Sequence, residues 1–213
     1  MRMTRVVCIA VCLGSSALAI AQDSFAHNMA DHQMNMQMGH EHGTAVPVTY
    51  EELTRTAAEL EAAKSATAKY QDVRVAQADG YQPIGPDVPG MGIHYVGSHA
   101  KNFEVEHPDI LLYEKNVSAP GGYALVGVSY LLVADTDTDG QPKNPPFPKS
   151  LASWHRHSDL CVFPDRSVKS GLTGDQCKAQ GGAFTALTQW MVHAWIWKDS
   201  PAGVFSPTNP RVQ

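Results

Sequence analysis

Hydrophobic residues recur at steps of three and four over residues 50–77, which is the spacing of one face of an α-helix. The series consists of Leu53, Ala57, Leu60, Ala63, Ala66, Tyr70 and Val73. Thr49 and Glu52 match a capping box, in which two side chains satisfy free backbone N–H groups. Asp79-Gly80 is a typical stop signal. The pattern predicts one long helix over residues 50–77.

After this helix the pattern changes to short runs rich in β-forming residues, separated by Gly-, Pro- and Asp-rich segments. We expect strands over residues 92–96, 110–115, 123–133, 154–163 and 190–197. Pro83, Pro86 and Pro89 predict a loop before the first strand, and residues 119–122 a hairpin turn between the second and third. This order predicts an α+β fold, with one long N-terminal helix packed on an antiparallel β-sheet or a small open barrel.

The N-terminus has the three parts of a signal peptide. Arg2 and Arg5 are positive, Val6–Ala21 is apolar but too short to span a bilayer, and Ala19-Ile20-Ala21 fits a cleavage site. An uncleaved anchor is the alternative. We expect a signal peptide over 1–21, a leader over 22–46 and a single α+β domain over 47–213. The mature protein is then periplasmic or secreted, with no membrane segment.

Cleavage changes the charge and the cysteine count. The formal net charge is −5, and the loss of two arginines makes it −7. Such an acidic chain does not attract nucleic acid, so that class of partner is excluded. Only Cys161 and Cys177 remain, and in an oxidising compartment they predict a disulfide. A thiolate metal site is the alternative, but neither cysteine has a Cys or His neighbour at zinc-finger spacing.

The leader is rich in methionine and histidine and has few large aliphatic residues, so we expect it to be disordered without a ligand. The residues concerned are His27, Met29, His32, Met34, Met36, Met38, His40 and His42. Thioethers are soft ligands that suit Cu(I), and imidazoles also serve Cu(II). The segment therefore predicts a flexible copper chelator, against the alternative of a polar leader with incidental histidines.

Four histidines of the domain are candidate ligands for one ion. His155 and His157 are two apart in a strand-like run, so they share a face. His94 follows a glycine-rich entry, and His193 lies in the last expected strand. We expect these four to converge on copper, with zinc or iron as alternatives in the folded domain. The competing interpretation is a set of structural histidines bonded to backbone carbonyls.

Three further residues have open or minor roles. Glu114, at the end of an apolar run, is a carboxylate ligand, a partner that orients an imidazole, or a solvent-exposed strand end. His99 and His107 lie in polar sequence, and we expect them to be solvated.

Three segments resemble an uncharacterised family of secreted bacterial proteins for which no activity is established. They are Gly90–Tyr95 (GMGIHY), His107–Glu114 (HPDILLYE) and His193–Val212, which begins HAWIW and ends SPTNPRV. The resemblance covers about residues 50–212 and implies a shared domain in which His94, Glu114 and His193 gain interest. It implies no reaction, and the Met/His leader is not part of the family pattern.

The sequence thus predicts a periplasmic copper-binding protein for copper tolerance, sequestration or delivery, whose partner is a copper transporter or a copper-receiving protein. The alternative is a secreted mononuclear metal-dependent enzyme, an oxidase, oxygenase or hydrolase, that uses the same histidines. In that case Trp154, Trp195 and Trp197 are candidates for the lining of a substrate pocket. A third hypothesis is a structural domain whose histidines bind no metal.

Overall fold

The predicted helix begins at its capping box but breaks before its end. The computed structural model describes residues 47–98 and 103–213. Helix α1 spans Tyr50–Thr67 and continues as a 3-10 turn over Ala68–Gln71, after which α2 spans Val73–Ala78. Asp72 is extended and its side chain accepts a hydrogen bond from the backbone N–H of Arg74, so it caps a new helix instead of continuing the first. The predicted long helix is therefore confirmed over residues 50–71, but it breaks at Asp72 instead of continuing to residue 77.

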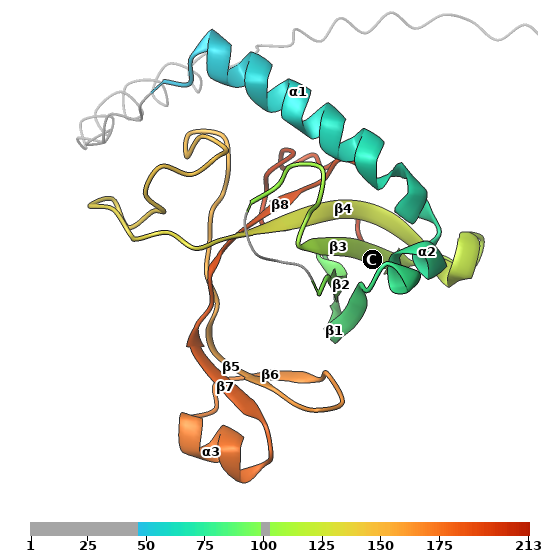
Figure 1. Cartoon of the computed structure of the whole chain (residues 1–213), viewed down its shortest axis with the longest axis vertical. Helices are drawn as coiled ribbons and strands as arrows, with labels where there is room; N and C mark the ends of the chain where they lie inside the picture. Colours follow the sequence, from blue (N-terminus) through green and yellow to red (C-terminus); the bar gives the residue numbers. More distant parts are fainter. Residues whose placement is uncertain (1–46, 99–102) are drawn as a thin grey trace, which may run out of the picture. The chain divides into compact units, whose positions relative to one another are not determined.

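The strands form two antiparallel sheets (Figure 1). The five-stranded sheet has the order β1-β2-β3-β4-β8, and the three-stranded sheet has the order β6-β5-β7. The strands of the larger sheet are β1 (Gln82–Val88), β2 (Gly92–Val96), β3 (Ile110–Lys115), β4 (Tyr123–Leu132) and β8 (Trp190–Ala194). The smaller sheet contains β5 (Ser158–Val162), β6 (Val168–Ser170) and β7 (Ala183–Leu187), with α3 (Gly174–Ala179) between β6 and β7.

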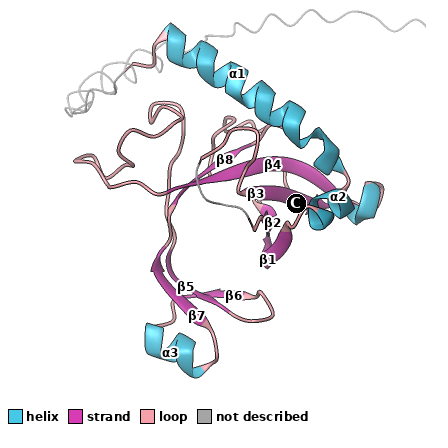
Figure 2. Cartoon of the chain, viewed as in Figure 1, coloured by secondary structure: helices cyan, strands magenta, loops and turns pink. Residues whose placement is uncertain are grey.

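This architecture confirms the predicted α+β class, with a helix on an antiparallel sheet that stays open (Figure 2). The predicted strands over 92–96 and 110–115 have the observed bounds. The prediction of a loop at Pro83 and Pro86 was wrong, because these prolines lie in β1. β1 is an edge strand, and its pairing with β2 is irregular between Ile84 and Val88, so both prolines lie where a missing N–H is tolerated.

The predicted strand over 154–163 was also only partly right. Its second half forms β5, in the smaller sheet. Its first half pairs only through a bridge between His155 and Met191. A disulfide joins Cys161 of β5 to Cys177 of α3, which confirms the predicted pairing.

The core lies between the helices and one face of the larger sheet. Tyr70 and Val73 from the helical segment pack with Tyr113, Val128 and other buried residues of that face. The hydroxyl of Tyr113 donates to the carbonyl of Tyr70 at 2.6 Å, so its buried polar end is satisfied. Within the described residues, no helix is long and apolar enough to cross a bilayer. The opposite sheet face, which the helices do not cover, is left for other contacts.

Candidate metal centre

Strand register places two of the predicted histidines on the sheet face opposite the helices. His94 of β2 stands opposite Leu112 of β3, and His193 of β8 stands opposite Ser129 of β4. Ser129 is in turn opposite Ile110, two residues from Leu112 on β3. Because directly opposed residues and residues two apart share a face, both imidazoles lie on the same side of the sheet.

The other two histidines reach this face through the bridge to β8. The backbones of His155 and Met191 exchange two hydrogen bonds, of 2.9 and 2.8 Å. Met191 is two residues from His193, so His155 points to the same side as His193. His157 follows two residues later, and its ring centre is 5.3 Å from that of His155. The face shared by His155 and His157 was predicted, although these residues form no regular strand.

The four imidazoles form a continuous cluster. The centre of the His193 ring is 5.5 Å from that of His94 and 5.1 Å from that of His155. Ligands at about 2.0 Å from a shared ion would have neighbouring ring centres about 5 Å apart. Among the described residues, however, no group of three or more His, Cys, Asp or Glu side chains already has the arrangement of a metal site. Binding one ion therefore requires some rotation of these rings.

Glycine at the entry to β2 allows His94 to occupy its place. Gly92 has a φ of +71°, and a Cβ at this position would lie 2.3 Å from the carbonyl oxygen of Tyr113. Any other residue would clash with the backbone of β3 and adopt a strained conformation. The glycine-rich entry noted in the sequence is thus needed for the close pairing of β2 with β3.

Backbone carbonyls fix the orientation of the two central imidazoles. Nδ1 of His193 lies 2.7 Å from the carbonyl oxygen of Pro207, and Nδ1 of His155 lies 3.0 Å from that of Ser153. Since a carbonyl oxygen only accepts, each Nδ1 carries the proton and donates it. Each Nε2 is then left with its lone pair, which is the arrangement that metal-binding histidines commonly have.

Two buried polar atoms at the centre of the cluster lack a partner. Nε2 of His193 and Oγ of Ser129 are both inaccessible to solvent and have no hydrogen-bond partner among the described residues. They belong to residues directly opposite each other on β8 and β4. A buried polar atom without a partner costs about 1–3 kcal/mol, so these two atoms favour a bound group that satisfies them.

The surroundings of His94, His157 and His193 favour the neutral imidazole. Burial, together with the neighbouring His157 and His155, lowers the pKa of His94 to about 4. Burial, assisted by the nearby His94, lowers the pKa of His193 to about 3, although the bond to the Pro207 carbonyl opposes this shift. The pKa of His157 is also lowered, first by burial and then by His155. Neutral imidazole is the form that binds metal ions, so all three are ready ligands at neutral pH.

The structure does not bring Glu114 to the imidazoles. Both carboxylate oxygens accept from Nζ of Lys198, at 2.7 and 2.6 Å. The side chain of Glu114 is 13% exposed and that of Lys198 31%, so the ion pair is partly buried. A carboxylate held in this way is neither a free ligand nor a partner of an imidazole. The third predicted role of Glu114, a solvent-exposed strand end, also disagrees with its low exposure.

The remaining predicted residues lie elsewhere. His107 is exposed and pairs with Glu104 at 3.3 Å, in agreement with a solvated role. His99 lies outside the described residues. All the leader residues predicted to bind copper also lie outside them: His27, Met29, His32, Met34, Met36, Met38, His40 and His42.

An apolar cleft of about 430 Å³ opens beside the cluster, with His94 and His157 in its lining. One wall comes from the larger sheet and includes Ile84 and Val96, and the other comes from the smaller sheet and includes Leu160. Sequence reasoning missed this cleft because β1 and the separate three-stranded sheet were not predicted. The three tryptophans predicted to line a substrate pocket are absent from its lining.

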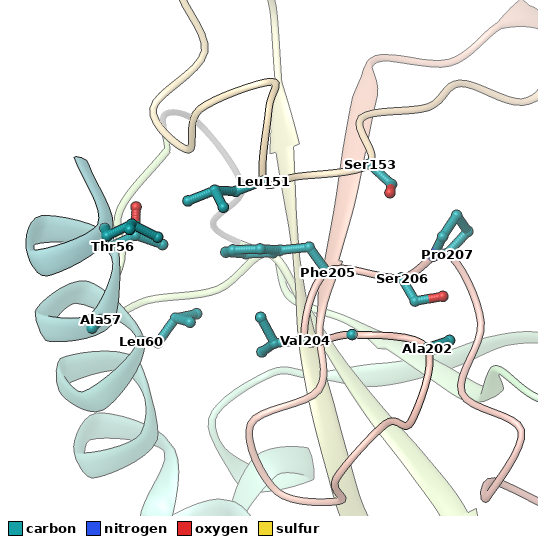
Figure 3. A pocket seen from close by; sticks show the side chains of 12 residues that line it. Thr56, Ala57, Leu60, Leu151, Ser153, Ala202, Val204, Phe205, Ser206 and Pro207 are labelled. Carbon is teal, nitrogen blue, oxygen red and sulfur yellow. The ribbon is translucent and has the colours of Figure 1, made fainter. Parts of the chain in front are cut away.

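A second cleft, of about 630 Å³, lies between α1 and the loop after β8 (Figure 3). Phe205 points from this loop toward the helix. The lining includes Ser153 and Pro207, the residues whose carbonyls orient His155 and His193. The wall of this cleft is therefore also the support of the two central imidazoles.

Comparison with known proteins adds no assignment to this geometry. No family model, curated protein or solved structure matches the chain. The resemblance to an uncharacterised secreted family stays a prediction, and the function has to be argued from the cluster itself.

Proposed function

We propose that this protein binds copper outside the cytoplasm and serves copper tolerance, sequestration or delivery. The observation that carries the proposal is the buried Nε2 of His193, which has no partner among the described residues and is surrounded by other imidazoles. The competing interpretation, a structural histidine bonded to a carbonyl, accounts for Nδ1 but leaves Nε2 unsatisfied.

The choice of copper draws on two kinds of ligand. Imidazoles alone suit copper, zinc and iron, so the cluster by itself does not select among them. The methionines of the leader favour copper because a thioether binds Cu(I) well and Zn²⁺ poorly. In this proposal the domain holds an ion through His94, His155, His157 and His193, while the leader captures further ions or passes them to a copper transporter or a copper-receiving protein.

The test compares copper binding by the mature chain with that of single variants. Titration with Cu(II) followed by elemental analysis is expected to show that His193→Ala and His155→Ala each lower the bound copper relative to the wild type. His107→Ala is the matched control, because His107 is exposed and pairs with Glu104 outside the cluster. This variant should bind as much copper as the wild type. Failure of the wild type to bind copper at micromolar concentrations would end the proposal, and equal copper content in all variants would remove the imidazole cluster from it.

A metal-dependent enzyme is the second candidate, and the apolar cleft beside His94 and His157 is the observation that favours it. An enzyme needs an open coordination position, whereas a storage site is closed. Azide added to the Cu(II)-loaded protein distinguishes the two by optical absorption. A new charge-transfer band would indicate an open position and favour the enzyme, while an unchanged spectrum would favour storage or delivery.

A further inference from the structure

The cleft beside the imidazole cluster has fixed walls. Arg166, in the turn between β5 and β6, donates from Nε to the carbonyl of Pro83 at 2.8 Å. Its own carbonyl accepts from the N–H of Gly85 at 2.9 Å. These two bonds, one from the Arg166 side chain and one between backbones, join the turn of the smaller sheet to β1 and hold the two walls of the cleft together. The cleft is therefore formed before any ligand arrives.

The lining is apolar and carries no formal charge. Ile84, Val96, Leu131, Leu160 and Val162 are among the apolar residues that line it. No Lys, Arg, Asp or Glu side chain of the described residues contributes to it. A volume of about 430 Å³ is within the range of small-molecule sites, roughly 300–1,000 Å³. A charged ligand would lose its hydration here without gaining a counter-charge.

The polar groups of the cleft are few and point to one kind of contact. His94 and His157 line it together with the uncharged residues Thr185, Thr188 and Gln189. Neither imidazole has a hydrogen-bond partner among the described residues. A neutral imidazole offers one N–H donor and one lone pair. A single hydroxyl or carbonyl on an apolar molecule would satisfy one of these groups.

We propose that this cleft binds a small, uncharged and mainly apolar molecule, whose one polar group meets His94 or His157. The proposal goes beyond copper binding and stands without it, because the lining and the volume do not depend on an ion. If the proposed copper site is also present, the molecule lies beside the metal and is a ligand or substrate of the same centre.

The probe is 2-naphthol, compared with the anion 2-naphthoate, which has the same ring system. Calorimetric titration of the metal-free mature chain is expected to show saturable binding of 2-naphthol. Binding of 2-naphthoate should be weaker by about tenfold or more, because its carboxylate finds no cation in the cleft. Absence of saturable 2-naphthol binding would overturn the proposal, as would equal affinity for the two probes.

A pair of tryptophan substitutions on β7 tests the place of binding. Thr185 lines the cleft, whereas its neighbour Ala186 is exposed and does not. Thr185→Trp is expected to fill the cleft and weaken 2-naphthol binding about tenfold or more, while Ala186→Trp leaves the affinity unchanged. Equal binding by both variants would place the probe elsewhere and contradict the proposal.

An NMR measurement on the wild type tests the same binding position without depending on whether a variant folds. Addition of 2-naphthol should shift the imidazole NMR signals of His94 and His157 but not that of exposed His107. Unchanged signals of His94 and His157 at saturation would refute the proposed position. Copper titration of the same sample is read separately. Binding of 2-naphthol without binding of copper would refute only the copper proposal. Binding of copper without binding of 2-naphthol would refute only the proposal of an apolar ligand in the cleft.

Discussion

His193 is fully buried, and its two ring nitrogens have different surroundings. Nδ1 donates to the Pro207 carbonyl, while Nε2 has no partner among the described residues. A protonated ring would add a buried charge close to His94 and His155. The same surroundings that make the ring a neutral ligand therefore make its protonation costly.

Loss of stability in acid follows from these surroundings. In the folded protein the pKa is about 4 for His94 and about 3 for His193, against 6.5 for an ordinary histidine. The unfolded chain therefore takes up protons first as the pH falls below 6.5. Stability is complete above this pH and decreases toward pH 4 and below, by about 1.4 kcal/mol per pH unit for each histidine.

Urea unfolding of the metal-free protein between about pH 7 and pH 5 measures this dependence. His193→Gln removes one of the titrating groups, so its free energy of unfolding should depend on pH less steeply than that of the wild type. His107→Gln, at an exposed position, serves as control and should keep the wild-type slope. Identical slopes for the wild type and His193→Gln would contradict the neutral, buried state of this ring.

The Glu114–Lys198 ion pair provides a second prediction for single residues. Glu114→Gln is expected to leave the copper content unchanged, because both oxygens are engaged by Lys198. The same change should lower the free energy of unfolding by about 1–2 kcal/mol, since a partly buried ammonium loses its partner. Elemental analysis and thermal unfolding measure the two effects.

Asp199→Asn is the matched control for this substitution. Its carboxylate is 97% exposed and lies 3.5 Å from Arg211, so the change should have almost no effect on stability. Loss of copper in Glu114→Gln, with no loss in Asp199→Asn, would show that Glu114 is a ligand after all.

Among the elements, the smaller sheet depends on its disulfide. Cys161 of β5 and Cys177 of α3 are both fully buried in a part of the molecule with few other buried residues. Reduction, or replacement of both cysteines by serine, should cost about 3 kcal/mol for a loop of 16 residues. Because the five-stranded sheet has its own core, the loss should be concentrated in β5, β7 and α3.

Hydrogen exchange resolves this effect strand by strand. We expect the amides of Cys161 and Phe184, which lie opposite each other on β5 and β7, to lose protection when the disulfide is reduced. The amides of Leu111 and Val128, which are paired on β3 and β4, should keep it. Equal loss of protection in both sheets would show that the molecule unfolds as one unit.

The elements also show how far the sequence could be interpreted. The capping box at Thr49 and the runs of β2 and β3 are local patterns, and they predicted observed element bounds. The prolines of β1 were misleading because an edge position is a property of the whole sheet. The four histidines could be chosen from their contexts, but the bridge from His155 to Met191 depends on pairing between distant segments.

For the whole molecule, the two proposed copper-binding parts have different requirements. The cluster needs the fold, because β2, β8 and the bridged segment each supply part of it. Methionine and histidine at close spacing in the leader need no fold to chelate an ion. Removing one part should therefore leave the copper binding of the other intact.

Deletion of residues 27–42 from the mature chain tests this independence. The shortened protein is expected to bind less copper than the full mature chain but to retain a single ion that His193→Ala removes. A variant with every Met and His of 27–42 replaced by serine keeps the length of the leader and should behave as the deletion does. Elemental analysis and competition with a copper chelator measure the content and the affinity. A shortened protein without copper would assign all binding to the leader, and the imidazole cluster would then be structural.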